Sequence, residues 1–417
     1  MRGVEQAGHF AGHVRAGLAL LASVCGVAPI HSQPPEASLA VQYTGDVLSD
    51  VRGGQATGTR YLHKVELVGD ATLHPSDATD LHVFVDVGHL NGVGFSRSLV
   101  GDIQGVSNIE AFHGFDLYQA WAAVSLPASA LSVTAGLIDA NASFDTENVG
   151  SLFINSSHGV GPEFLHTGLT GPSIFPLISW GLVVEKIWDE ANDDDPFVTR
   201  IGFLDGAQGD PNAPDHFSFH PPGRDGVLLV AQAEKKLGPD GGIEIGYWQY
   251  TTRLDVSGFG SAVPEPRRGE KGGYVRFEGP LSFIRIGQGR PFSGWLRAGV
   301  GDARFNPVSS YLGGGIVATG VLFPRASDKL GVAVASAGLS RRFRDAANAA
   351  GGSPGSRETN IAVTYSLPWR DVTFQPDFQY VINPSGGGQT GNAVVVGLRI
   401  AFKTNIVATK PPAGGLR

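Results

Sequence analysis

The sequence has almost no cysteine, and it has no excess of positive charge. Its one cysteine, Cys25, lies in an N-terminal leader, so the mature chain is expected to carry no thiol. That absence excludes disulfides, cysteine nucleophiles and Cys-based zinc sites from the mature protein. The formal net charge of −8 argues against general binding to nucleic acid, which requires a basic surface.

Long apolar runs are missing as well, and the longest one belongs to the leader. Arg2 and Arg15 supply positive charge, and the apolar stretch Ala16–Ile30 follows Arg15. Such a stretch is typical of a secretory signal and too short for a membrane-spanning helix. We therefore expect residues 1–32 to direct export and to be removed.

Signatures of catalysis and of metal binding are also missing. No Gly-x-Ser-x-Gly elbow, P-loop or dinucleotide fingerprint lies on a strand–helix unit. His74, His82, His89 and His113 include no pair at the spacing of a helical zinc site, and the acidic run Asn192–Asp195 does not match a calcium loop. We therefore predict no enzymatic activity, no catalytic residue, no metal and no cofactor.

What the chain does contain is short segments in which apolar and polar residues alternate. Between residues 372 and 382, Phe374 and Phe378 share one parity, whereas Asp377 and Gln379 share the other. A second alternating run follows a glycine-rich turn. Successive side chains of a strand point to opposite faces of a sheet, so the pattern predicts a hairpin with one oily and one polar face. Such a hairpin fits either a half-buried soluble sheet or a barrel wall in lipid.

Segments of this kind recur along the whole chain. About sixteen of them, mostly about 8–13 residues long, have the length of a tilted membrane strand, and their number is even, as in single-chain bacterial barrels. The long irregular stretches 91–115 and 141–179 exceed what a soluble domain normally needs. The pattern favours an all-β fold, a transmembrane antiparallel β-barrel over residues 33–405, followed by a short C-terminal extension over residues 406–417.

Five stretches together resemble the carbohydrate-selective porins of the OprB family. They are SLVGDIQGVSNIEA (98–111), FDLYQAW (115–121), SLFINSSHG (151–159), FQPDFQYVINP (374–384) and NAVVVGLRIAF (392–402). The resemblance implies a sixteen-stranded barrel in the bacterial outer membrane, narrowed by an inward-folded constriction loop. It implies passive diffusion of mono- and small oligosaccharides, with sugars and outer-membrane lipids as partners. Monomer and homotrimer both stay open.

A sugar channel needs polar groups that bond to hydroxyls and aromatic faces that stack on pyranose rings. The inward parity of the predicted strands carries both kinds of group, and the loop 144–173 is the candidate constriction. The predicted pore-lining residues are Lys64, Glu66, Asp86, Trp121, Asp145, Glu147, Asn155, His158, Glu163, Arg276, Glu278, Arg297, Asp377, Gln379 and Arg399. In a competing interpretation, Leu152, Phe153 and Ile154 anchor the loop to the wall while its polar residues satisfy backbone groups. Both interpretations can hold together.

Three alternative functions stay open at this point. A general non-selective porin would share the barrel without a preference for sugars. An outer-membrane barrel enzyme acting on lipid would need a Ser/His pair with an orienting acid, and no spacing in the sequence points to one. A secreted β-sandwich binding protein would have fewer strands and polar outer faces.

Overall fold

The structure, a computed structural model, describes most of the chain. The described residues are 36–92, 94–188, 195–209, 225–238, 240–255, 265–281, 292–320, 327–388 and 390–409. The expected signal peptide at 1–32, with Cys25, lies outside the described residues, as do residues 192–194 and 410–417.

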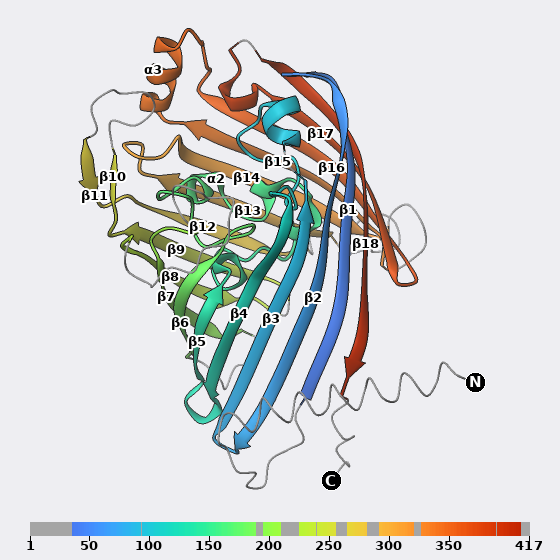
Figure 1. Cartoon of the computed structure of the whole chain (residues 1–417), viewed down its shortest axis with the longest axis vertical. Coiled ribbons are helices and arrows are strands. Elements are labelled where there is room, and N and C mark those ends of the chain that lie inside the picture. Colours follow the sequence, from blue (N-terminus) through green and yellow to red (C-terminus); the bar gives the residue numbers. More distant parts are fainter. Residues whose placement is uncertain are drawn as a thin grey trace.

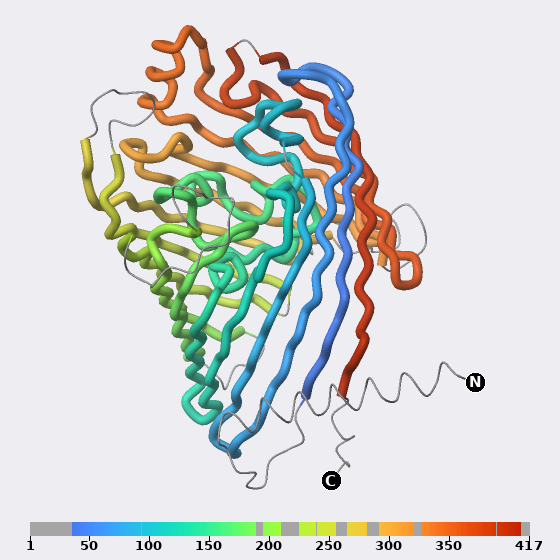
Figure 2. Tube along the Cα trace, in the orientation of Figure 1, coloured from blue at the N-terminus to red at the C-terminus, as the bar shows by residue number. Residues whose placement is uncertain are grey.

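Sixteen antiparallel strands close into a barrel (Figures 1 and 2). They are β1 (Glu36–Gly54), β2 (Gly58–Ser76), β3 (Thr79–Asn91), β4 (Gly114–Leu126), β5 (Leu131–Ile138), β6 (Ser179–Ile187), β7 (Phe197–Asp205), β8 (Val227–Lys236), β9 (Gly242–Tyr250), β12 (Lys271–Pro280), β13 (Phe292–Gly301), β14 (Val308–Thr319), β15 (Lys329–Leu339), β16 (Arg357–Trp369), β17 (Val372–Ile382) and β18 (Gly391–Ala408). Each strand pairs with its neighbour in the sequence, except that β9 pairs with β12. Closure confirms the predicted barrel and excludes the β-sandwich.

The barrel closes where β1 pairs with β18, from Ser38 opposite Ala408 to Gly54 opposite Gly391. Because β18 continues to Ala408, it passes residue 405, where we expected the barrel to end. Between β9 and β12 the chain forms a separate two-stranded ribbon of β10 (Arg253–Asp255) and β11 (Pro266–Arg268). The sequence pattern did not predict this ribbon.

All helices among the described residues are short. They are η1 (Ser96–Val100), η2 (Pro127–Ser129), η3 (Ala140–Ala142), η4 (Gly150–Leu152), η5 (Ser156–His158), α2 (Pro162–Leu165), α3 (Arg341–Ala349) and η6 (Pro384–Gly386). The hydroxyl of Ser340 caps α3 by accepting a hydrogen bond from the backbone N–H of Phe343. None of the helices in the described ranges is long and apolar enough to cross a membrane.

The two faces of the wall differ as the alternation predicted. On β17, Gln375, Asp377 and Gln379 are buried inside the barrel, whereas Phe378 is exposed on its outside. Exposed Val, Leu, Ile and Phe side chains recur on the outward parity of the other strands. An outward apolar band with a polar interior is typical of a barrel wall in lipid.

The two ends of the barrel also differ. Residues 77–78 and 370–371 connect strands by tight turns at the end where β1 begins and β18 ends, the lower end in Figure 1. Residues 92–113 and 139–178 make long connections at the opposite end. In outer-membrane barrels short turns face the periplasm, so we call the lower end the periplasmic end.

The outward parity yields a test of the lipid-facing wall. Val334 lies near the middle of β15 and is 44% exposed. We expect Val334→Arg to lower the free energy of unfolding in lipid vesicles by about 2–4 kcal/mol, because a guanidinium at mid-membrane depth must leave water. Val334→Leu is the matched control and should stay near the wild-type value. Equal stability of the two variants in urea titrations would contradict an outer wall in lipid.

Candidate functional site

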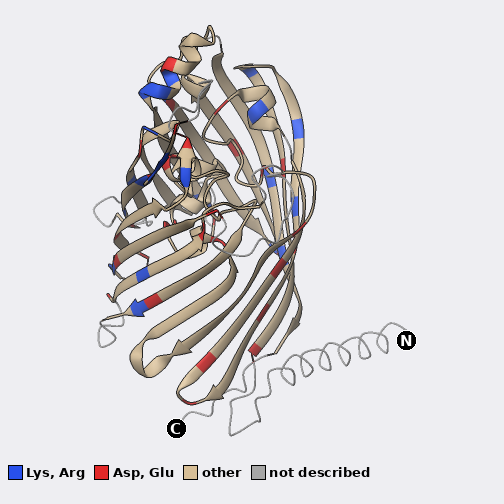
Figure 3. Cartoon of the chain, turned by 60° about the vertical axis from the view of Figure 1, so that its left-hand side comes forward, with Lys and Arg blue, Asp and Glu red and all other residues tan. Residues whose placement is uncertain are grey.

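Two long connections fold into the barrel and meet inside it. We call residues 92–113 the first inner loop and residues 139–178 the second inner loop. The backbone N–H of Asn108 donates to the carbonyl of Ile154 at 2.7 Å, and that of Ser156 donates to the carbonyl of Gly105 at 2.9 Å. These bonds join the two loops into one partition across the lumen. Figure 3 shows acidic segments near the centre of the barrel, where this partition meets the wall.

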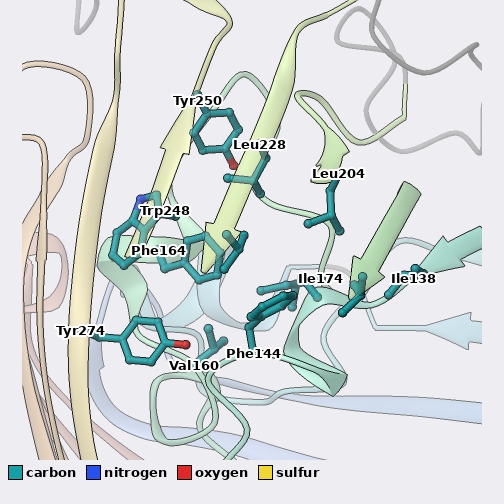
Figure 4. Close-up of a cluster of buried hydrophobic side chains, with 13 residues drawn as sticks. Ile138, Phe144, Val160, Phe164, Ile174, Leu204, Leu228, Trp248, Tyr250 and Tyr274 are labelled. Atoms are coloured by element: carbon teal, nitrogen blue, oxygen red, sulfur yellow. The ribbon is translucent and has the colours of Figure 1, made fainter. Parts of the chain in front are cut away.

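Apolar side chains fix the second inner loop to the wall (Figure 4). Phe144, Val160 and Phe164 pack into one buried cluster with wall residues that include Trp248 and Tyr274. Burying such a side chain stabilises the folded state by about 1.5–3 kcal/mol. The loop is thus held by its own small hydrophobic core inside a polar lumen.

The middle of the same loop has two further anchors. Phe153 is buried against Trp295, and Ile154 enters a different cluster with Val381 of β17. Gly331 of β15 makes room for this packing, because a Cβ there would lie 2.7 Å from the Phe153 ring. The anchoring role considered for Phe153 and Ile154 is therefore present.

Arg297 of β13 holds two carboxylates from separate parts of the second inner loop. Its Nε donates to Asp145 Oδ1 at 2.8 Å and its Nη2 to Asp145 Oδ2 at 2.7 Å, while Nη1 lies 2.8 Å from Glu163 Oε1. The Arg297 side chain is 1% exposed, and its guanidinium also lies over the rings of Tyr274 and Tyr311. A planar, bidentate guanidinium fixes both the position and the orientation of a carboxylate.

Arg276 of β12 organises a second group of charges beside the first. Its Nη2 lies 2.8 Å from Glu244 Oε2, and Nη1 lies 3.7 Å from Glu147 Oε1. Glu278 accepts hydrogen bonds from the backbone N–H groups of Asn148 and Val149, at 3.0 and 2.9 Å. The wall carboxylate of Glu278 therefore holds the loop backbone directly.

The two arginines face more carboxylates than they can neutralise. Two guanidinium groups stand against Asp145, Glu147, Glu163, Glu244 and Glu278. Both oxygens of Glu147 lack a hydrogen-bond partner among the described residues. Burial raises the pKa of Glu147 well above its ordinary value; attraction to Arg276 lowers it, and repulsion from Glu278 and Asp145 raises it further. Burial likewise raises the pKa of Glu163.

Amide side chains connect both inner loops to β17. Asn155 Nδ2 donates to Gln379 Oε1 at 3.1 Å, and Gln379 Nε2 donates to the carbonyl of Val106 at 2.9 Å and to Asp377 Oδ2 at 2.9 Å. His158 is packed between Phe153 and Trp295, and burial lowers its pKa to about 4. His158 is therefore neutral near neutral pH.

The first inner loop is anchored on the other side of the barrel. Arg399 Nε donates to Asp46 Oδ1 at 2.7 Å, and Arg399 Nη2 donates to Asn108 Oδ1 at 2.8 Å. Glu358 accepts hydrogen bonds from the backbone N–H groups of residues 103 and 104. The sequence analysis missed Asp46 and Glu358, and it did not place the first inner loop inside the lumen.

The remaining predicted residues lie on β2, β3 and β4. Lys64 Nζ lies 2.7 Å from Glu66 Oε1 and 5.0 Å from the centre of the Phe175 ring. Trp121 stacks on Phe84 with ring centres 5.1 Å apart. Asp86 is buried on the same inward face of β3 as Phe84. We call Phe84 and Trp121 the aromatic wall.

The structure thus divides the predicted residues into two sets. Most of them lie where the inner loops contact the wall: Asp145, Glu147, Asn155, His158, Glu163, Arg276, Glu278, Arg297, Asp377, Gln379 and Arg399. The others lie on β2–β4: Lys64, Glu66, Asp86 and Trp121. No group of three or more His, Cys, Asp or Glu side chains within the described ranges could hold a metal ion.

Removing the guanidinium of Arg297 should release the second inner loop. Arg297→Met leaves Asp145 and Glu163 buried without a cation, which costs about 3–5 kcal/mol. We expect loss of hydrogen-exchange protection across residues 144–164 and a larger, noisier single-channel current. The variant Arg297→Met/Asp145→Asn/Glu163→Gln is the matched control, because it removes the stranded charges and should regain most of the protection. Full protection in Arg297→Met alone would refute this role.

Seating of the second inner loop should weaken as pH rises. An acid whose pKa is higher in the seated loop than in water holds its proton longer there, so stability is lost above its ordinary pKa. Hydrogen-exchange protection of residues 147–150 should fall as pH rises above the ordinary pKa of a glutamate, by at most about tenfold per pH unit for one proton. Glu147→Gln should flatten this dependence. An identical slope in the variant would show that Glu147 is not the titrating group.

Comparisons with known proteins agree with this architecture. A model of the carbohydrate-selective porin OprB family matches residues 71–403. A high-pH structure of Pseudomonas putida OprB has a TM-score of 0.74 at 20% identity, covering 88% of this chain and 94% of that one. The outer-membrane channel DcaP of Acinetobacter baumannii has a TM-score of 0.53 at 10% identity, with coverages of 89% and 97%. No curated protein matches the chain.

At these identities the solved structures show the fold alone, whereas the family model covers most of the chain. That family consists of channels rather than enzymes. The chain therefore belongs to the OprB family of carbohydrate-selective porins.

Proposed function

We propose that this porin lies in the bacterial outer membrane and lets mono- and small oligosaccharides diffuse passively through a water-filled lumen. The observation that carries this proposal is the pair of inner loops, anchored by Arg297 and Arg399 inside a closed barrel. Because this partition is fixed to the wall, it narrows the lumen permanently. It is not a plug that must move before solutes can pass. The proposal includes export directed by a signal peptide at residues 1–32. It is compatible with a monomer or a homotrimer.

The aromatic wall supplies the contacts that a passing sugar needs. The Phe84–Trp121 stack offers an apolar face for the C–H surface of a pyranose ring. Lys64 lies six residues along β2 from Asp70, the partner of Phe84, and supplies a donor for sugar hydroxyls at a separate point of the lumen. Such contacts are individually weak, which suits a channel in which the solute must leave as readily as it enters. We propose that sugars pass along this wall, opposite the loop anchors on β12 and β13.

Liposome swelling tests the preference for sugars. Purified porin should admit neutral mono- and disaccharides faster than amino acids or ions of similar size, because hydroxyl-bonding groups replace water around a sugar at little cost. Deleting Asp145–Glu163 should raise the single-channel conductance at least about twofold, because the partition loses its larger half. The deletion variant must first show the heat-modifiable gel migration of a folded barrel.

Equal swelling rates for all solutes would leave a general porin and remove the preference for carbohydrate. An unchanged conductance after the deletion would rule out the second inner loop as the constriction.

A further inference from the structure

A polar recess lies inside the barrel between the second inner loop and the wall of β12–β17. Asn148, Ser151 and Leu152 border it on the loop side. The wall side includes Ser293, Thr319, Lys329, Ser366 and Gln375. Its volume of about 630 Å³ lies within the range of small-molecule sites in proteins. The recess shares no residue with the aromatic wall on β3 and β4.

The strand register makes the wall side of this recess one continuous surface. Ser293 pairs with Val317, Thr319 pairs with Lys329, and Lys329 pairs with Ser366. These residues share the inward parity of their strands with buried interior residues such as Trp295. They also lie toward the periplasmic ends of those strands, so the recess lies on the periplasmic side of the loop.

The recess offers hydroxyl groups that the described residues leave without a hydrogen bond. The hydroxyls of Ser293, Thr319 and Ser366 make no hydrogen bond to any other described residue. Gln375 is fixed in place, because its Nε2 donates to the carbonyl of Leu152 at 2.6 Å and to Thr364 Oγ1 at 3.0 Å. Its Oε1 remains available as an acceptor.

The charges of the recess indicate the class of ligand. Among the described lining residues, Lys329 and Asp240 carry charge, one of each sign, so this lining favours neither an anion nor a cation. Hydroxyls both donate and accept, which matches the hydroxyls of a neutral sugar. The apolar lining from Leu152, Val317 and Pro368 suits the C–H face of the same ligand.

We propose that this recess binds a neutral mono- or disaccharide after it has passed the inner loops, as a second holding site on the periplasmic side. The proposal rests on the proposed function, since the ligand is the solute that the channel admits. A holding site here would delay return of the sugar through the constriction without driving transport.

The test compares sugar binding in two sets of hydroxyl deletions. In Ser293→Ala/Thr319→Val/Ser366→Ala, the dissociation constant for glucose or maltose, measured from sugar-induced current noise in planar bilayers, should rise at least about tenfold. The open-channel conductance should stay unchanged, because the side chains keep their size. The matched control is Ser125→Ala/Ser132→Ala, which removes two bonded inward hydroxyls from β4 and β5 near the same end. Its dissociation constant should equal the wild-type value.

An unchanged dissociation constant in the triple variant would overturn the holding site, and so would an equal loss in the control pair. Tighter binding of gluconate than of glucose, lost in Lys329→Met, would assign an anionic ligand and overturn the neutral class. Liposome swelling with the wild-type porin keeps the two proposals apart. A porin that admits sugars while the triple variant binds them normally would leave the proposed function standing and remove only the recess.

Discussion

The structure of the lumen depends on the ion pairs that Arg297 makes with Asp145 and Glu163. These carboxylates lie 18 residues apart in the second inner loop, and one guanidinium from β13 holds both. A buried pair of this kind adds little net stability over an apolar contact, since desolvation offsets much of the attraction. What it adds is geometry, because a bidentate contact admits one position of the loop. A constriction requires that property, since a displacement of the loop changes the width of the passage.

The apolar anchors require the same position of the second inner loop relative to the wall. The Phe153 ring fits against the wall because Gly331 has no side chain there. The Phe144 ring likewise fits because Gly202 has none. The ion pairs and the apolar contacts therefore independently favour the same position of the loop. The first inner loop is held by hydrogen bonds instead, from Ser107 to Asp46 and from Arg399 to Asn108, while Asp46 and Arg399 form an ion pair within the wall. Because Gln379 bonds to both loops, displacement of one loop is resisted by the anchors of the other.

The alternation of residues predicted the strands well, because a strand in a barrel wall has water or protein on one side and lipid on the other. Phe378 and Gln379 sit on the faces that their parity assigns. The alternation of residues tells which face of the wall a side chain lies on, but not whether water reaches it. It therefore could not show that Asp145 and Arg297 neutralise each other in a buried contact. That contact joins residues 152 positions apart and follows from closure of the barrel. The helix α3 and the inward course of the first loop likewise depend on what lies beside them in space, although the motif at residues 98–111 marked that loop as distinctive.

The excess of carboxylates around Arg276 shows how a loop can be anchored in a water-filled lumen. A purely apolar seat would leave an oily surface facing water whenever the loop moved, whereas carboxylates regain hydration when they leave their partners. Both oxygens of Glu147 lack a hydrogen bond to any described residue, and its burial opposes the loop position that Arg297 and Glu278 stabilise. The two effects act on the same short segment, because Glu147 directly precedes the backbone N–H groups that Glu278 binds. The position of the loop thus depends on the strong anchor at Arg297 and on the cost of burying Glu147 beside it.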